Sequence, residues 1–414
     1  MSRLGTPLRV AYLMSRFPKL SETFILYELL ALEQLGVAIE IFPLIREREP
    51  VAHREAARLA ERAHDVRILS RAVLAAQWYW LRRRPMAYLG SWLATLRGNV
   101  ARPSFLARAM AVVPLAATFA RRMEELRVDH IHAHWATHPA LAAYVASRLT
   151  GVPYSFTAHA HDIFVQRPML REKIRRASFV VTISEYNRRF LEGLYGRVAA
   201  DRVVVVHCGT DPEVFRPPRA AATRGRWTIV CVASLQPQKG QGHLVEACRL
   251  LADRGTDLEC LLVGDGETRD ELVRRIKFAG LEERVKLLGN QPRHRVVELM
   301  GSADVVVQPS IILGSGKMEG IPLALMEALA MERPVVASAI SGIPELIEDG
   351  VTGLLVPPGD PRRLATALHS LFVDRAFAEL LGQAGRRRVV ADFDQKRSAR
   401  ELARMFASTR GVSG

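Results

Sequence analysis

The stretch "MEGIPLALMEAL", Met318–Leu329, carries two glutamates eight residues apart on either side of a proline. Pro322 suits the first position of a helix, where its missing N–H costs nothing. Glu319 then lies in the loop before the predicted helix, and Glu327 lies about 7–8 Å further along the helix axis. Because carboxylates are costly to bury without partners, the stretch predicts a site that uses both of them at the start of a buried helix.

The start of this predicted helix suits an anionic ligand, because free N–H groups and the helix dipole favour a phosphate. The spacing of the two carboxylates is close to that between a diphosphate and the ribose of the same nucleotide. One carboxylate can accept hydrogen bonds from ribose hydroxyls, and the other can hold sugar hydroxyls or orient the loop. The alternative is a surface glutamate and a core-edge glutamate capped by local amides. The amides available here belong to Gly320, Ile321 and Leu323.

Strand-like apolar runs alternate with helical patterns on both sides of this stretch. Such alternation predicts parallel sheets with helices on both faces, and 414 residues are too many for one compact core. The run "GTDPEVFRPP", residues 209–218, is rich in turn formers and is interpreted as a linker. The predicted fold class is therefore α/β, with two doubly wound Rossmann-like domains, residues 1–208 and 219–390, facing a cleft. We expect strands at residues 8–15, 37–44, 129–134, 153–159, 178–184, 202–209, 227–234, 258–264, 284–289, 304–310 and 334–338.

The composition is typical of a soluble globular protein, with 49% hydrophobic and 24% charged residues. No run of 18 consecutive apolar residues occurs, so no transmembrane helix is expected, and the N-terminus lacks the features of a signal peptide. The cysteines form no CxxC pair and are interpreted as buried free thiols in a reducing cytoplasm. We therefore expect a cytoplasmic protein, with the option of peripheral attachment to the inner face of the cytoplasmic membrane. The four cysteines are Cys208, Cys231, Cys248 and Cys260.

The formal charge of +15 is concentrated in one helical segment, residues 66–127, which holds eleven arginines, no lysine and only two acids. Basic and aromatic side chains on amphipathic helices suit an anionic membrane surface. A solvated helical face is the plainer alternative. Nucleic acid is a third, but no recognised nucleic-acid motif supports it, and we expect none as a partner. The side chains expected at the membrane are Arg82, Arg83, Arg84, Trp78, Trp80 and Trp92.

Two further loops of the second half join a strand to a helix. In "SLQPQKGQ", Ser234–Gln241, Lys239 stands at a helix start, where a lysine beside free N–H groups favours a phosphate. In "LLVGDGE", Leu261–Glu267, a Gly-Asp-Gly turn opens a helix, although glycine is often only a turn device. Neither loop is a Walker A motif, because GxxxxGK[ST] occurs nowhere in the chain.

The run "PSIILGSGKMEGIPLALMEALAMERPVVASAISGIPELIEDGVTGLLVPPGD", residues 309–360, resembles the donor-binding core of the retaining GT-B glycosyltransferases, the group 1 family with the E-x7-E motif. Four more segments, "VASLQPQKG", "LLVGDGE", "HCGTDPEVFRP" and "SRFPKLSETFILYELLALEQLG", match the same family in order. The resemblance therefore covers nearly the whole chain. It looks closest to bacterial members that build exopolysaccharides, colanic-acid-like polymers or lipopolysaccharide.

The resemblance implies transfer of a sugar from a nucleotide diphosphate sugar to an acceptor hydroxyl, with retention of the anomeric configuration. It implies an acceptor-side domain at residues 1–208, with residues 66–127 as a helical insertion. Residues 219–390 would bind the donor, and residues 391–414 would form a C-terminal helix returning to the first domain. A lipid-linked saccharide is the expected acceptor, and no cofactor is expected. A GT-B-fold nucleotide-sugar epimerase and a non-catalytic nucleotide-sugar-binding scaffold are the alternatives.

The family roles are carried over to matching positions. Glu327 would hold the ribose, Glu319 the transferred sugar, and Lys239 the diphosphate. In "FTAHAHDIF", His159 matches the family histidine that contacts the donor sugar. The donor-binding positions completed by the resemblance are Gly320, Ile321, Leu323, Gly264, Asp265, Gly266, Gly289, Asn290 and Ser234, and the acceptor-side candidates are Ser21, Thr23, His134, His161 and Asp162.

Two departures from the family pattern stand out. The family usually has an arginine where this chain has Ser234, so one phosphate cation is missing or comes from elsewhere, with Arg293 and Lys317 as candidates. The loop "SRFPKLSETF" after the first strand lacks the glycines that many members carry there.

Three histidines, His130, His132 and His134, alternate along one predicted strand and share a face. A metal site is conceivable there, but histidines at a strand end also serve as hydrogen-bonding groups. The acidic "DFD" at residues 392–394 precedes a helix, which favours helix capping over metal binding. We expect no catalytic metal, with the helix dipole and Lys239 stabilising the leaving diphosphate instead.

Overall fold

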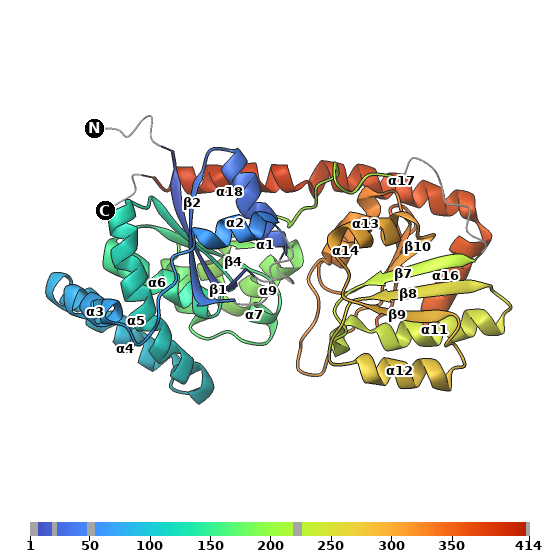
Figure 1. The fold of residues 1–414 in the computed structure, drawn as a ribbon, viewed down its shortest axis with the longest axis horizontal. Coiled ribbons are helices and arrows are strands. Elements are labelled where there is room, and N and C mark those ends of the chain that lie inside the picture. The colour runs from blue at the N-terminus through green and yellow to red at the C-terminus, as the bar shows by residue number, and fades with distance from the viewer. Residues whose placement is uncertain (1–6, 19–22, 48–53, 218–225, 411–414) are drawn as a thin grey trace. The chain divides into compact units, whose positions relative to one another are not determined.

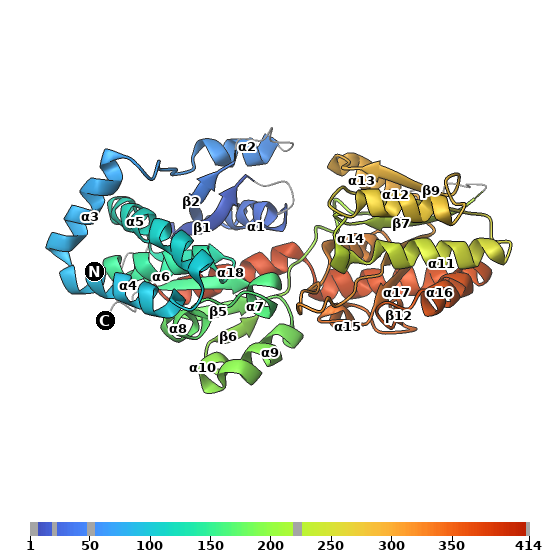
Figure 2. The same cartoon turned by 90° about the horizontal axis from the view of Figure 1, so that it is seen from below.

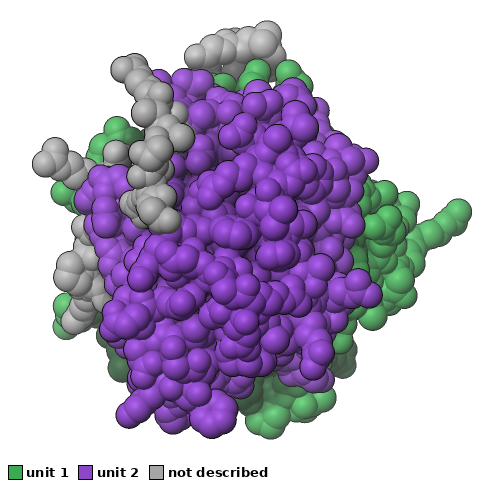
Figure 3. Space-filling view, turned by 90° about the vertical axis from the view of Figure 1, so that its right-hand side faces the viewer, with its two compact units in different colours: residues 1–206, 398–414 green, residues 207–397 purple. Residues whose placement is uncertain are grey.

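The computed structural model describes residues 7–18, 23–47, 54–217 and 226–410. It divides the chain into two compact units, one formed by residues 1–206 with 398–414 and the other by residues 207–397 (Figure 3). The division falls next to the predicted linker at residues 209–218.

The first unit is built on a parallel sheet of six strands in the order β2-β1-β3-β4-β5-β6. Parallel strands need helical crossovers, and the helices provide them, so the predicted α/β class is confirmed. The strands are β1 (Arg9–Phe17), β2 (Ala38–Arg46), β3 (His130–His134), β4 (Tyr154–Ala158), β5 (Phe179–Thr182) and β6 (Val203–Val205). The helices are α1 (Thr23–Gln34), α2 (Arg54–Glu61), α3 (Arg71–Arg83), α4 (Pro85–Asn99), α5 (Pro103–Leu126), α6 (His138–Thr150), α7 (His161–Phe164), α8 (Leu170–Arg176), α9 (Glu185–Tyr195), α10 (Arg197–Ala200) and α18 (Gln395–Ser408).

Both faces of this sheet are covered, so β3 and β4 are buried along their whole length although polar side chains alternate along them. Val10, Tyr12 and Met14 of β1 belong to one core with residues of α1, α2 and α18. On the other face, Phe42 of β2 packs against Phe119 of α5, with ring centroids 5.3 Å apart.

The second unit repeats the scheme with a parallel sheet in the order β12-β11-β10-β7-β8-β9. Its last strand, β12 (Leu354–Val356), was absent from the sequence prediction, because three residues give too short a pattern. The other strands are β7 (Trp227–Val232), β8 (Leu258–Val263), β9 (Val285–Gly289), β10 (Val305–Gln308) and β11 (Val335–Ser338). The helices are the 3₁₀ turn η2 (Pro237–Lys239), α11 (Gln241–Asp253), α12 (Arg269–Phe278), α13 (Arg293–Gly301), α14 (Leu323–Ala330), α15 (Ile343–Leu346), α16 (Pro361–Val373) and α17 (Arg375–Asp392).

Each sheet has one point where the strand order reverses, between β1 and β3 in the first unit and between β7 and β10 in the second. Ligands of open α/β sheets bind beyond the carboxyl ends of the strands at such a point. The fold therefore directs attention to the loops after β1 and β3, and to those after β7 and β10.

The arginine-rich segment forms α3, α4 and α5, which pack against one another at the edge of the first unit (Figures 1 and 2). Trp78 is exposed on α3, and Trp92 of α4 is half-buried. The expectation that Trp80 faces a membrane is wrong, because its side chain is buried and its Nε1 donates to the carbonyl oxygen of Ala117, 2.7 Å away. Trp78 and Trp80 lie about 200° apart around the helix, so they cannot share a face.

One helix among the described residues, α5, is long and apolar enough to cross a membrane. Half of its apolar window is buried inside the first unit. A core helix passes the same test, so this is weak evidence for a membrane span.

The chain returns to the first unit at its end. Ala399, Leu402 and Phe406 of α18 are buried in the core that also contains β1 and α1. Figure 1 shows α18 alongside the strands of that unit, although the last of these strands, β6, ends 190 residues before α18 begins.

Candidate active site

The helix that follows the E-x7-E loop starts one residue later than predicted. α14 begins at Leu323, and Pro322 is its N-cap with φ −65° and ψ 128°. Proline adopts this extended conformation readily, so it also suits the N-cap position. The N–H of Leu323 remains among the free groups of the first turn, with Gly320 and Ile321 buried in the loop before it.

Lys239 and Glu319 form an ion pair in the second unit, with Nζ 2.6 Å from Oε2. Their side chains are only 16% and 17% exposed, so solvent screens the pair weakly. Lys239 ends η2, and the next residue, Gly240, has φ +68°. A Cβ on Gly240 would clash with the carbonyl oxygen of Pro309, so glycine lets this loop approach the end of β10.

The Gly-Asp-Gly turn after β8 is held against the lysine loop. Gly264 has φ +133° and Gly266 has φ +156°, and a Cβ on either would clash with a carbonyl oxygen, of Ala233 or Leu235 respectively. The loop after β7 and the loop after β8 are therefore packed backbone to backbone, as close approach requires.

Glu327 lies on α14, in the fifth position of the helix, and is half-buried. Burial raises the pKa of Glu327 to about 7, while the charge of Arg293 opposes the shift. Hydrogen-bond donors such as ligand hydroxyls would stabilise the ionised carboxylate of Glu327 in this partly buried position.

The remaining predicted donor residues lie in loops of the same unit. Ser234 is exposed and is followed by the Lys239 turn, while Asp265 is exposed in the Gly-Asp-Gly turn. Gly289 ends β9 with φ +67° and accepts at its carbonyl oxygen from the N–H of Gly264, 2.9 Å away, and Asn290 is exposed beside it.

Arg293 and Lys317 are the two candidates for the second phosphate-binding cation, which the family has at the position of Ser234. The guanidinium of Arg293 lies 5.4 Å from the ring centroid of Phe215 and acts electrostatically on Glu327. Lys317 Nζ lies 3.5 Å from Oε1 of Gln236 in the lysine loop.

The first unit gathers aromatic and titratable side chains after β3 and β4. The ring of His159 lies between those of Phe24 and Trp135, with centroid distances of 4.9 and 4.5 Å. His159 Nε2 is 3.2 Å from His134 Nδ1, and His134 Nε2 is 3.0 Å from Glu28 Oε1. Burial and then the neighbouring His134 hold the pKa of His159 well below its usual value, so its ring stays neutral.

The backbone of His159 is fixed from both sides. Its N–H donates to Asp162 Oδ1 at 3.1 Å, and its carbonyl oxygen accepts from Asn187 Nδ2 at 2.5 Å. Asp162 is buried and also accepts from the N–H groups of Ala136 and Ala160. Asp162 therefore fixes the backbone conformation of the loop that carries His159.

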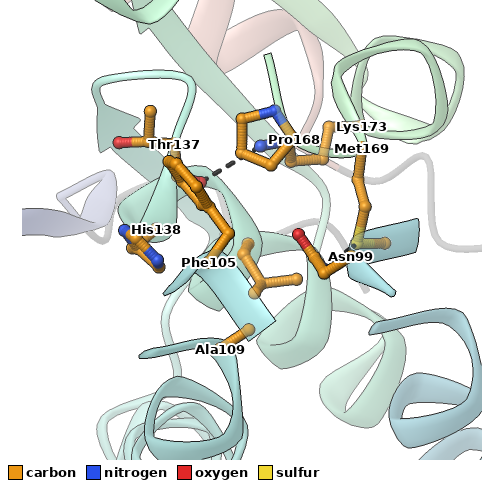
Figure 4. A pocket seen from close by; sticks show the side chains of 9 residues that line it. Asn99, Phe105, Ala109, Thr137, His138, Pro168, Met169 and Lys173 are labelled. Atoms are coloured by element: carbon orange, nitrogen blue, oxygen red, sulfur yellow. Dashed lines mark hydrogen bonds between the residues drawn. The ribbon is translucent and has the colours of Figure 1, made fainter. Parts of the chain in front are cut away.

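Lys173 holds the turn that follows β3, close to Asp162. Its buried ammonium donates to the carbonyl oxygens of Ala136 and Thr137, and burial lowers the pKa of Lys173 to about 7. Beside it is a cavity of about 10 Å³, enough for about one water and too small for a sugar (Figure 4). The cavity is lined by Asn99, Phe105, Ala109, Thr137, His138, Leu141, Pro168, Met169 and Lys173.

The other acceptor-side candidates are less informative. Ser21 lies outside the described residues, and Thr23 begins α1. His161 begins α7, and its Nδ1 is buried without a hydrogen-bond partner among the residues the structure describes.

Comparison with known proteins accounts for both units. The family described as "Glycosyl transferases group 1" matches residues 217–388, and "Glycosyltransferase Family 4" matches residues 49–214. The "GDP-mannose-dependent alpha-(1-6)-phosphatidylinositol monomannoside mannosyltransferase" of Mycobacterium tuberculosis (strain ATCC 25618 / H37Rv) is 30% identical over 68% of this chain and 77% of its own. The chain belongs to the group 1 glycosyltransferases.

Other relatives of this glycosyltransferase carry names from polysaccharide synthesis. The "Putative colanic acid biosynthesis glycosyltransferase WcaL" of Escherichia coli (strain K12) is 29% identical over 96% of this chain and 99% of its own. The "Amylovoran biosynthesis glycosyltransferase AmsK" of Erwinia amylovora is 38% identical, over 50% of this chain and 51% of its own. The crystal structure of Anabaena Alr3699/HepE in complex with UDP has a TM-score of 0.73 at 20% identity, covers 97% of this chain and 100% of its own, and shares the fold.

Some polar residues near the candidate site had no signal in the sequence. Gln308 and Ser310, at the carboxyl end of β10, are buried, and Gln308 Oε1 and Ser310 Oγ have no hydrogen-bond partner among the described residues. Tyr12 and Glu28 were also missed, although Glu28 contacts the predicted His134. For Gln308 and Ser310, their position at the strand-order reversal of the second sheet could have pointed to them.

The three strand histidines of the glycosyltransferase do lie on one face, around Phe406 and Tyr12. Glu28, His132 and His134 each offer a ligand atom, all within 4.8 Å of one another. The ring nitrogens of His132 already lie 2.8 and 3.0 Å from the hydroxyls of Ser155 and Thr157. A metal ion here would have to displace these hydrogen bonds.

Proposed function

We propose that this glycosyltransferase moves a sugar from a nucleotide diphosphate sugar to an acceptor hydroxyl with retention of the anomeric configuration. The observation that carries the proposal is the ion pair between Lys239, at the end of η2, and Glu319, in the loop before α14, with Glu327 further along α14. Phosphate contacts from Lys239 and the start of α14 would thus lie beside the sugar contact of Glu319 and the ribose contact of Glu327. The names of the relatives, from amylovoran and colanic acid biosynthesis, favour a role in polysaccharide synthesis. We propose a bacterial surface polysaccharide as the product and a lipid-linked saccharide at the cytoplasmic side as the acceptor.

In the proposed reaction the bond between the anomeric carbon and the diphosphate oxygen breaks, and a bond from that carbon to the acceptor oxygen forms. The acceptor hydroxyl gives its proton to the leaving phosphate on the same face of the sugar. Charge grows on the diphosphate as the bond breaks, and Lys239 with the first N–H groups of α14 stabilises it without a metal. Glu319 holds hydroxyls of the transferred sugar, Glu327 holds the ribose, and His159 offers a sugar contact in the first unit.

The test combines donor binding with product analysis. UDP-, GDP- and ADP-sugars are compared by thermal shift, since a bound ligand raises apparent stability by mass action. The stabilising donor is then incubated with a lipid-linked saccharide extract, and the anomeric configuration of the product is read by NMR. An epimer or free sugar without acceptor would identify an epimerase, and binding without turnover would identify a scaffold.

We also propose that the arginine-rich helices dock on anionic lipid. Arg82, Arg83 and Arg84 are exposed, and Arg82 stacks 4.4 Å over the exposed Trp78. Met86, 83% exposed, adds an apolar group at the start of α4. Cations beside exposed apolar groups suit a lipid headgroup region.

Replacing Arg82, Arg83 and Arg84 with glutamate is expected to reduce co-sedimentation with anionic liposomes, because each basic residue near such a surface contributes about 1 kcal/mol. Binding by the unchanged protein should rise with anionic lipid and fall with salt. The matched control changes the exposed arginines of α8, Arg171, Arg175 and Arg176, to glutamate. Equal partitioning to neutral and anionic vesicles would argue against docking.

A further inference from the structure

Four polar side chains of the first unit form one continuous hydrogen-bonded chain. Tyr12 Oη lies 2.8 Å from Glu28 Oε1, and the same carboxylate oxygen lies 3.0 Å from His134 Nε2. His134 Nδ1 lies 3.2 Å from His159 Nε2. The chain thus runs from β1 through α1 and β3 to the loop after β4.

The end of this chain fixes the direction of every bond in it. A glutamate carboxylate has acceptors only, so it must receive hydrogens from both Tyr12 and His134. Burial, then the charge and the hydrogen bond of Glu28, raise the pKa of Tyr12 well above its usual value, so Tyr12 keeps the hydrogen that it donates. With one ring hydrogen, which is donated from Nε2, His134 carries a lone pair on Nδ1 and can only accept there.

The same logic passes on to His159. Since His134 Nδ1 accepts, His159 Nε2 carries the hydrogen and Nδ1 carries the lone pair. Among the residues that the structure describes, none hydrogen-bonds to His159 Nδ1, so this lone pair remains available to a ligand.

We propose that Glu28, acting through His134, fixes His159 in the Nε2–H tautomer, so that His159 Nδ1 accepts a hydrogen bond from a sugar hydroxyl. Glu28 and His134 are positioning residues in this scheme, and His159 touches the substrate. The identity of the hydroxyl rests on the proposed function, but the tautomer does not. If His159 Nδ1 can only accept, a donor sugar without a hydroxyl facing this nitrogen should bind less well, because the lone pair of Nδ1 would stay unpaired.

The tautomer can be read directly by ¹⁵N NMR on the full chain with labelled histidine, without any donor. In the unchanged protein we expect a protonated Nε2 and an unprotonated Nδ1 for His159, assigned by the signals lost in His159→Gln. The double variant Tyr12→Phe with Glu28→Leu removes the carboxylate together with the hydroxyl that would otherwise be left unpaired. It should show both tautomers of His159.

Tyr12→Phe alone is the matched control for the spectrum, since it keeps Glu28 and should keep the single tautomer. The double variant should lose about three- to tenfold in turnover, the scale of one hydrogen bond. Glu33→Gln, on the same helix but paired with Arg58 and Arg62, should change neither the spectrum nor the rate.

A protonated Nδ1 in the unchanged protein would overturn the proposal even if the double variant failed to fold. So would a single, unchanged tautomer in the double variant, or a histidine spectrum that shifts on chelation or on adding Zn²⁺. If His159 is found in the Nε2–H tautomer but no nucleotide sugar is turned over, the proposed function is wrong and the proposal on the tautomer is supported.

Discussion

Replacing Lys239 with alanine is expected to lower kcat by about 10²–10³-fold at saturating donor, as when one preorganised donor is lost from an oxyanion site. The charge on the diphosphate grows as the sugar–phosphate bond breaks, so the loss should appear in turnover more than in donor binding. Lys239 is the cation that pairs with Glu319, and Ser234 stands where the family has a second one. The measurement is kcat with a saturating donor.

Two further variants separate charge from structure. Lys239→Arg keeps a cation and should lose less, and Ser234→Arg in the Lys239→Ala background should restore part of the rate. Glu319→Ala should mainly lower turnover, and its coupling with Lys239→Ala follows from a double-mutant cycle. Near-normal turnover in Lys239→Ala would mean that another cation, such as Lys317 or Arg293, holds the phosphate.

Replacing Glu327 with alanine is expected to weaken donor binding by about 1.5–3 kcal/mol, the scale of hydrogen bonds to a charged group. The pKa of Glu327, raised to about 7 by burial, adds a pH dependence. Ionised Glu327 accepts from ribose hydroxyls, so donor affinity should rise up to about tenfold between pH 6 and pH 8. Glu327→Gln, which cannot ionise, should flatten this rise.

The raised pKa of Glu327 makes the stability of the ligand-free protein fall with pH, whereas donor affinity should rise with pH. The folded-state pKa of about 7 lies above the ordinary value of 4.5, so the folded state holds the proton more tightly. The contribution of Glu327 to the free energy of unfolding is therefore present at low pH and is lost as pH rises through 7. Glu327→Gln should raise Tm of the ligand-free protein at pH 8. The exposed Glu298→Gln on α13 is the control for both measurements, and an unchanged Kd in Glu327→Ala would remove this residue from the donor site.

The sequence predicted most of both sheets because buried parallel strands are apolar on both faces and stand out as short runs. β12 was missed because Leu354–Val356 has no room for a pattern. Pro322 was placed one position too far into α14, since proline suits both the N-cap and the first helical position. The membrane expectation went wrong at Trp80, since composition does not say which face of a helix is buried.

The site was predictable where neighbours in sequence are neighbours in space, as in the loop from Glu319 to Glu327. It was not predictable where contacts depend on the tertiary fold. Glu28 of α1 and His134 of β3 are 106 residues apart in sequence and meet only in the folded structure. Lys239 and Glu319 are 80 residues apart, and their pairing depends on the closeness of the loops after β7 and β10.

Because α18 is buried in the first unit, it also determines which of the two units can complete its fold first during synthesis. Domains usually fold in the order of synthesis, beginning at the N-terminus. Here the ribosome delivers every residue of the second unit before Leu402 and Phe406, which fill the core around Tyr12. The second unit can therefore complete its fold first, and part of the apolar core of the first unit stays uncovered until α18 has been translated.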